Sequence, residues 1–302
     1  MAVAGAAEWR LTMKYTTKTE KIIFNILFIL MSISILIPML IVVSASISNE
    51  KDLLVNGYSI LPRKIDFAAY KYLFHNLSVI LQGYKITLIT SLAATAWAMF
   101  IQTMFAYPLT KRNFGPKNVI LKMLLITMLF SGGLVPSYLL NTRYLHLQDT
   151  IWIYIIGACN NAWNIFLLKG CYKDVPESLL DAAKIDGASD FRILYSLVIP
   201  MTKSVIVMLA FGTFMGKWND WGTSMIYINN KTELYTIQYI LQRALQNLTF
   251  VMQQGGMSAE DYVPVETIKM AMAVIVAVPV LLIFPFFQKH LTHGVTMGSV
   301  KE

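Results

Sequence analysis

Residues 22–43 read IIFNILFILMSISILIPMLIVV, a run that contains no charged side chain. Spanning about 30 Å of hydrocarbon takes roughly 20 apolar residues, so this run can cross a membrane as a helix. Because backbone polar groups find no water in lipid, such runs are expected to be helices rather than open strands. The sequence therefore predicts an all-α polytopic membrane protein with six transmembrane helices, at residues 22–43, 86–109, 119–140, 151–168, 204–228 and 268–287.

The composition excludes several other classes of protein. With 56% hydrophobic and only 14% charged residues, the 302-residue chain cannot build a water-soluble surface and is too apolar to be disordered. Its formal charge of +8 comes from Lys and Arg scattered between apolar blocks, so no basic stripe predicts nucleic-acid binding. The two cysteines, Cys159 and Cys171, are too few for a disulfide framework, and we expect free thiols.

The distribution of Lys and Arg predicts the orientation of the chain. Fourteen of them lie in the segments that share a side with both termini, against eight in the loops of the other side, which places both termini in the cytoplasm. We expect a cytoplasmic N-terminal segment at 1–21, a six-span domain at 22–287 and a cytoplasmic tail at 288–302. No cleavage pattern follows the first run, which indicates a retained signal anchor. Residues 1–12 share no pattern with the rest, and Met13 is a second plausible start.

Two of the six runs depart from the simple apolar pattern and carry clustered polar side chains at membrane depth. Such groups are costly unless they face a neighbouring helix or a water-filled cavity, which makes them candidates for a substrate path. Helix-to-helix hydrogen bonding and an interfacial aromatic belt are the alternative interpretations. The candidates are Asn160, Asn161, Trp163 and Asn164 in the fourth run, and Trp218, Asn219, Asp220 and Trp221 in the fifth.

Between the fourth and fifth runs, residues 171–200 form the least hydrophobic cytoplasmic stretch and predict a helix-turn-helix. Asp174 is expected to cap the first helix, with Glu177 in a capping-box relation to it. Gly187 supplies the left-handed stop, Ser189 caps the second helix, and Pro200 discourages its continuation.

The first of these helices has a half-apolar body that includes Leu180, with two adjacent alanines, Ala182 and Ala183, beside Asp181. Two alanines remove side-chain bulk, so the surface of another protein can approach the helix closely. The pattern fits a docking helix for a partner protein, and it fits equally an ordinary loop helix packed on its own bundle.

The loop also resembles a known family. Asp181-Ala182-Ala183, then Asp186-Gly187-Ala188 and Ile199-Pro200, look like the EAA loop of binding-protein-dependent ABC importer permeases, with Asp in place of the usual Glu. FSGGLVPSY at 130–138, Trp218-Asn219-Asp220, QKH at 288–290 and GVTMGSVK at 294–301 are similar to the carbohydrate-uptake branch, in particular to permeases for complex oligosaccharides and polysaccharide fragments. The likeness runs from about Lys18 onward.

The resemblance implies a MetI-like permease bundle in a bacterial plasma membrane that moves an oligosaccharide inward. It implies as partners a second permease subunit in a heterodimer, two ATP-binding subunits and an extracellular sugar-binding protein. This chain would bind no cofactor, with ATP and Mg held by the partner subunits. The residues that it assigns to ATPase coupling are Glu177, Leu180, Asp181, Ala182, Ala183, Asp186, Gly187 and Pro200.

Other functions find weaker support in the sequence. Gly212 to Lys217 has the wrong spacing for a phosphate-binding loop, and Trp218 stands where Ser or Thr must reach Mg²⁺. The histidines lack nearby acidic or Cys ligands, so we expect no metal site. The alternative is an ion- or proton-coupled secondary carrier that works alone, for which Asp220 is the main candidate residue. A membrane-embedded enzyme would need a catalytic constellation that the sequence does not offer.

Overall fold

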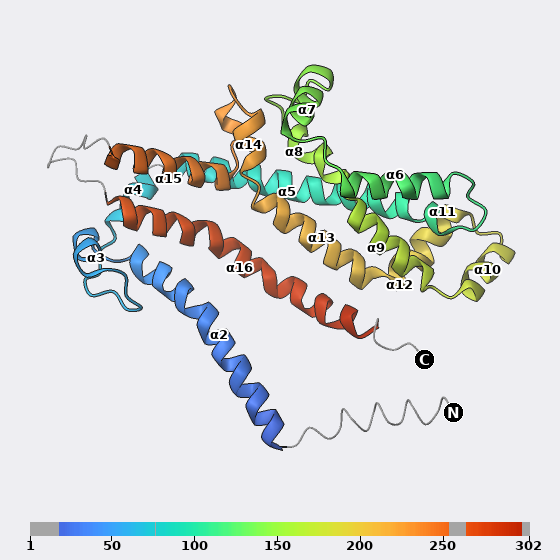
Figure 1. Cartoon of the computed structure of the whole chain (residues 1–302), viewed down its shortest axis with the longest axis horizontal. Helices are drawn as coiled ribbons and strands as arrows, with labels where there is room; N and C mark the ends of the chain where they lie inside the picture. Colours follow the sequence, from blue (N-terminus) through green and yellow to red (C-terminus); the bar gives the residue numbers. More distant parts are fainter. Residues whose placement is uncertain (1–17, 76, 254–263, 298–302) are drawn as a thin grey trace. The chain divides into compact units, whose positions relative to one another are not determined.

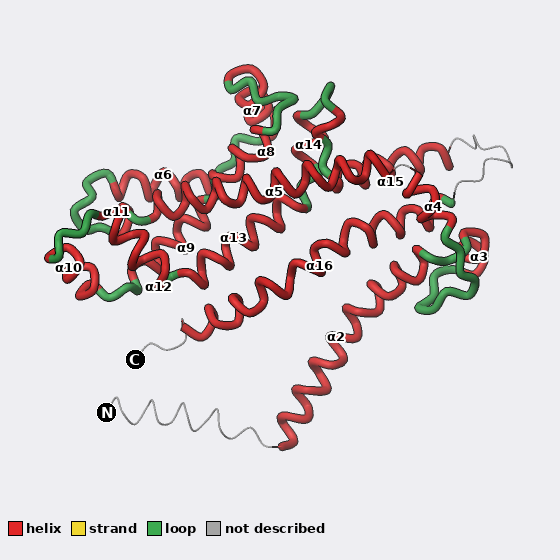
Figure 2. Tube along the Cα trace, turned by 180° about the vertical axis from the view of Figure 1, so that it is seen from behind, coloured by secondary structure: helices red, strands yellow, loops and turns green. Residues whose placement is uncertain are grey.

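The computed structural model describes residues 18–75, 77–253 and 264–297, and most of these residues are helical (Figure 1, Figure 2). Within these ranges the one β pairing is an isolated bridge between Ser48 and Ile65. The prediction of an all-α protein is confirmed. Residues 1–12 and the last five residues of the predicted tail lie outside the described residues. The chain divides into two compact units, one of residues 1–75 and 257–275 and the other of residues 76–256 and 276–302.

The first unit contains α2 (Lys18–Ser46), α3 (Glu50–Asn56), α4 (Ala68–His75) and the start of α16 (Val265–Met297). The buried carboxylate of Glu50 accepts hydrogen bonds from the backbone N–H groups of Glu266 (2.8 Å) and Thr267 (2.7 Å). A carboxylate satisfies the free N–H groups of a helix N-terminus and complements its partial positive charge. Glu50 therefore fastens α3 to the beginning of α16.

The second unit is organised around α5 (Leu77–Ala106), which packs against several other helices. They include α8 (Trp152–Ile156), α9 (Ala162–Lys173), α13 (Lys203–Trp218) and α15 (Ile237–Gln253). Both views show α13 running alongside α5 (Figure 1, Figure 2). Ala94, Ala98 and Ala106 of α5 are fully buried, because small side chains let neighbouring helices approach closely.

Glycine serves the same purpose where α5 meets α15. A Cβ atom added at Gly83 would lie 2.6 Å from Ile240 Cδ1 and 3.3 Å from the backbone Cα of Ile237. Both distances are tighter than ordinary contact, so Gly83 sets the separation of these two helices.

Three of the predicted spans are continuous helices that are long and apolar enough to cross a membrane. They lie at Glu20–Ser46, Leu77–Thr110 and Val265–Pro285, and they correspond to the first, second and sixth runs. The most apolar 18-residue stretch of the first of them, within α2, has no buried residue, whereas Ser44, Ala45 and Ser46 at its end are buried. Such a helix is suited to lipid or to another chain rather than to water.

The expectation of one continuous helix is wrong for the other three spans. The third is bent by 116° between α6 (Lys117–Leu129) and the segment Leu134–Tyr144, which comprises α7 (Leu134–Leu139) and a π-helical turn, Leu140–Tyr144. Gly133, at φ 85°, supplies a conformation there that other residues adopt with strain. The fourth is divided among α8, a 3₁₀ turn at Gly157–Cys159 and α9. The fifth is interrupted between α13 and α14 (Gly222–Tyr227).

The segment before α13 also differs from the expectation. The helical path runs through α11 (Asp190–Ile193), a π-helical turn at Leu194–Val198 and α12 (Ile199–Met201), so it passes Pro200 instead of ending there. Proline has no N–H to donate to the preceding turn, and the π-helical turn lies directly before it. The direction changes by 82° only at Thr202, between α12 and α13.

Candidate functional site

The break in the fourth span is built by its asparagines. Asn161 is the N-cap of α9, and its side-chain oxygen accepts a hydrogen bond from the backbone N–H of Asn164 at 3.2 Å. Asn160 sits between the 3₁₀ turn and α9 with a non-helical backbone. Asn favours caps because its short side chain replaces a missing backbone partner. The polar residues found in the sequence are thus the cause of the interruption.

A fully buried side chain of α5, Gln102, stabilises this break from the opposite side. Its Nε2 donates to the carbonyl oxygens of Ala158 and Cys159, each at 3.3 Å, and its Oε1 accepts from Asn164 Nδ2 at 3.1 Å. Irregular backbone is tolerated at membrane depth where protein groups satisfy its hydrogen bonds. Gln102 is not among the residues predicted from the sequence, although a single amide within the apolar run 86–109 is a signal that could have identified it.

The asparagines line a cavity of about 320 Å³ that lies between the fourth span and α13. Its polar lining brings together Asn160, Asn161 and Asn164 with Lys217 and Thr213. Gly212 and Gly216 line the same cavity on α13, where the absence of side chains leaves room. Polar side chains around a small cavity at membrane depth are the arrangement expected of a path for a hydrated solute.

The other predicted path residues do not line this cavity. Trp163 is 60% exposed, and Asn219 and Trp221 are also exposed. Trp218 is buried, with its ring centroid 5.8 Å from that of Phe214 and 6.4 Å from that of Tyr84. These positions suit aromatic packing and surface contact rather than a shared polar pocket.

The carboxylate of Asp220 forms hydrogen bonds at the start of α14. Its carboxylate accepts hydrogen bonds from the backbone N–H (2.9 Å) and the hydroxyl (2.6 Å) of Thr223, and it forms an ion pair with Lys217 Nζ at 3.3 Å. Asp220, which precedes the N-cap residue Trp221, therefore satisfies a free N–H group in the first turn of α14 and orients the lysine that lines the cavity. This explains why the fifth span is interrupted after Trp218.

The predicted helix-turn-helix is present at the other end of this unit, where α10 (Glu177–Ile185) lies near α11 (Figure 1). Gly187 has φ +77°, and Ser189 caps α11 by accepting from the backbone N–H of Arg192 at 3.3 Å, so both predictions are confirmed. The prediction that Asp174 caps α10 is wrong. Asp174 instead ends α9, and Pro176, with no side-chain cap, precedes α10 because its fixed φ already suits a helix start.

The helix α10 presents much of its surface outward. Leu180 and Ala183 are partly buried against the core of the unit, whereas Ile185 is 86% exposed. An exposed isoleucine on a short amphipathic helix is suited to a partner protein. The remaining predicted coupling residues, Glu177, Asp181, Ala182, Asp186, Gly187 and Pro200, are exposed.

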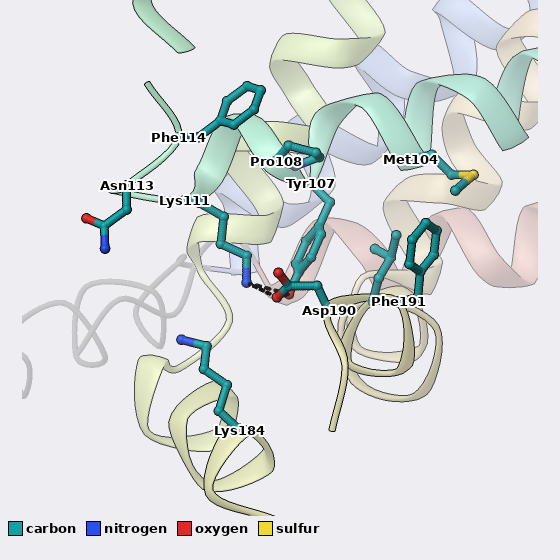
Figure 3. A pocket seen from close by; sticks show the side chains of 10 residues that line it. Met104, Tyr107, Pro108, Lys111, Asn113, Phe114, Lys184, Asp190 and Phe191 are labelled. Atoms are coloured by element: carbon teal, nitrogen blue, oxygen red, sulfur yellow. Dashed lines mark hydrogen bonds and ion pairs between the residues drawn. The ribbon is translucent and has the colours of Figure 1, made fainter. Parts of the chain in front are cut away.

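Ion pairs connect this loop to the end of α5. Lys111 Nζ lies 2.7 Å from Asp190 Oδ1 and donates to the hydroxyl of Tyr107 at 2.8 Å (Figure 3). Burial lowers the pKa of Lys111, but the hydrogen bonds to Asp190 and Tyr107 outweigh it and raise the pKa overall. The hydrogen bond from Lys111 lowers the pKa of the Asp190 carboxyl, so both groups stay charged near neutral pH. These contacts link the start of α11 to the segment that follows α5.

Comparison with known proteins identifies the family. The family model for the binding-protein-dependent transport system inner membrane component matches residues 86–297. Protein LplC of Bacillus subtilis (strain 168) is 33% identical, with 95% of this chain and 97% of LplC covered. The polygalacturonan/rhamnogalacturonan transport system permease protein YtcP of the same organism is 30% identical, with 93% of this chain and 98% of YtcP covered.

A solved structure shares the fold. In the crystal structure of a bacterial ABC transporter involved in the import of the acidic polysaccharide alginate, one chain matches with a TM-score of 0.78 and 25% identity. The match covers 91% of this chain and 98% of that chain. The predictions of a permease bundle and of a multi-pass protein of the bacterial inner membrane are confirmed. The chain belongs to the family of binding-protein-dependent transport system inner membrane components.

Proposed function

We propose that this chain is one permease subunit of an ATP-driven importer that moves an oligosaccharide into the cell. The observation that carries the proposal is the cavity lined by Asn160, Asn161, Asn164 and Lys217. Amide side chains offer both donors and acceptors, which match the hydroxyl groups of a sugar. Relatives named as permeases for polygalacturonan/rhamnogalacturonan and for arabinooligosaccharides support this substrate class.

The chain supplies the path, and its partners supply the energy. We assign ATP and Mg to two separate ATP-binding subunits, which dock on the exposed surface of α10. A second permease subunit completes the path as a heterodimer, and an extracellular sugar-binding protein delivers the substrate. When the ATP-binding subunits close, α10 moves with them, and the contact of Lys111 with Asp190 transmits that movement to α5.

The alternative of a carrier that works alone has less support. An ion-coupled carrier needs an acidic group that is able to gain and lose a cation or proton within the path. Asp220 was the candidate, but its carboxylate is engaged by Lys217 and Thr223 and does not line the cavity.

The test combines co-purification with one cavity variant. We expect mild-detergent purification of the tagged chain from its native membranes to retain a second permease, an ATP-binding subunit and a sugar-binding protein. Asn160→Ala should lower oligosaccharide uptake at least several-fold while the same subunits still co-purify, because Asn160 lies in the cavity and away from α10. Asn219→Ala is the matched control, since Asn219 is an exposed asparagine outside the cavity.

Two results would contradict the proposal. If the chain purifies alone and its uptake depends on an ion gradient rather than on ATP, the carrier alternative is correct. If Asn160→Ala transports like the wild type, the cavity is not the path, whatever the subunit composition.

A further inference from the structure

A second cavity, of about 550 Å³, lies between α10, the loop after α5 and the end of α9. Five basic side chains line it, against two acidic ones. Three of the basic residues form ion pairs: Lys111 with Asp190, Arg112 with Glu177 at 3.2 Å, and Lys184 with Asp181 at 3.0 Å. The two remaining basic residues of the lining are Lys117 and Lys173.

These two lysines belong to an uncompensated positive cluster. Burial, followed by the charges of Lys173 and Lys117, lowers the pKa of Lys169, so Lys169 lies close enough to be repelled by both of these ammonium groups. Lys117 Nζ donates only to backbone carbonyls, that of Lys111 at 3.1 Å and that of Thr110 at 3.5 Å. Among the described residues, no acidic side chain forms an ion pair with any of the three. An anionic group would relieve this repulsion.

The tyrosine in the same lining lacks a hydrogen-bond partner. Tyr172 is 3% exposed, and its hydroxyl oxygen is buried without any partner among the described residues. Because that oxygen is buried, the donors that this lining offers to a phosphate oxygen, a strong acceptor, are the ammonium groups of Lys117 and Lys173.

An apolar cavity of about 420 Å³ adjoins the basic one, and the two share Lys111, Asn113 and Lys184 in their linings. Figure 3 shows Met104 and Phe191 on one side of this space and Lys111 and Lys184 on the other. Phe191 is 62% exposed. Met104 lies in the last turn of a membrane-spanning helix, α5, at its cytoplasmic end, where acyl chains meet headgroups.

We propose that these adjoining cavities bind an anionic phospholipid of the inner leaflet, with its phosphate beside Lys117 and Lys173 and its apolar part against Phe191. Basic pockets between helices on the cytoplasmic side are suited to anionic headgroups. The apolar neighbour favours a lipid over soluble phosphate, which offers nothing for Phe191 to contact. Bound next to α10, the lipid influences the position of the loop.

The experiment measures lipid retention on the full-length chain with its co-purifying subunits. The complex is exchanged into mixed phosphatidylglycerol and phosphatidylcholine bicelles, and the bound lipid is counted by native mass spectrometry. With roughly 1 kcal/mol for each basic residue near a membrane surface, the double variant Lys117→Gln, Lys173→Gln should retain phosphatidylglycerol about 30-fold more weakly. Lys117→Arg, Lys173→Arg should retain it as the wild type does.

The matched control removes two other cytoplasmic-side charges, with Lys122→Gln and Lys203→Gln, because neither residue lines either cavity. The proposal predicts unchanged retention in this control. Equal loss in both double variants would overturn it, since the attraction would then be general. Displacement of phosphatidylglycerol by an equal concentration of inorganic phosphate would show a soluble-phosphate site and overturn the lipid assignment.

Discussion

Replacing Gln102 by Leu should weaken the second unit at the break in its fourth span. The substitution removes a fully buried amide of α5 and three hydrogen bonds at once. Leu is of similar size, so the apolar contacts of α5 are largely kept and the change isolates the polar interactions.

The structure gives the expected size of the effect. The carbonyl of Cys159 keeps a second partner, the backbone N–H of Asn161 at 3.0 Å, whereas Asn164 Nδ2 and the carbonyl of Ala158 lose the bond that Gln102 provides. Each buried group left unsatisfied costs roughly 1–3 kcal/mol, so the two orphaned groups should lower the free energy of unfolding of Gln102→Leu by about 2–6 kcal/mol. Adding Asn164→Leu should cost less than the sum of the single changes, because it removes one orphaned donor.

The assay is thermal unfolding of the detergent-purified chain, followed by oligosaccharide uptake in membranes. Gln82→Leu is the matched control on the same helix, because Gln82 makes a single exposed hydrogen bond, to the carbonyl of Glu233 at 2.9 Å. A Gln102→Leu protein that unfolds at the wild-type temperature would refute the reasoning. The same holds if Gln82→Leu is equally destabilised.

Three further predictions concern the loop and the helix packing. Gly187→Val should reduce ATP-driven uptake strongly, whereas Gly187→Asn should keep most of it. The φ angle of Gly187 is +77° and no atom lies within 4 Å of an added Cβ, so the two variants differ only in backbone strain. Equal uptake by both would contradict this. Asp190→Asn should lower uptake by the same factor at pH 6 and pH 8, because both partners of the ion pair stay charged over this range. The stabilisation from Asp190 is present above its unfolded pKa near 3.9 and is lost as pH falls through its lowered folded pKa. The stabilisation from Lys111 is present below its unfolded pKa of about 10.4 and is lost as pH rises through its raised folded pKa. A factor that changes between these pH values would show that another group controls the contact. Gly83→Val should separate α15 from α5 and speed hydrogen exchange in α15, whereas Gly170→Val, with open space around it, should not.

The sequence by itself determined the class of fold and the local geometry of the cytoplasmic loop. Apolar runs long enough to cross a bilayer leave helices as the only solution, because lipid cannot satisfy backbone groups. Gly187 and Ser189 act on their immediate neighbours, so their roles could be predicted from position alone. The prediction for Asp174 was wrong because this residue lies between the end of α9 and the start of α10, and the local sequence does not show which of the two helices it ends or begins.

The tertiary structure alone decided which polar residues work together. Gln102 and Asn164 are 62 positions apart in the sequence, and Lys217 is farther still, yet all three lie at the broken fourth span or its cavity. A hydrogen bond between distant residues depends on how α5, α9 and α13 pack, which apolar periodicity does not specify. Local interactions therefore determine the helices and their caps, which made these features predictable from the sequence. Packing between helices determines which residues line the cavity, and it places Trp163 outside it.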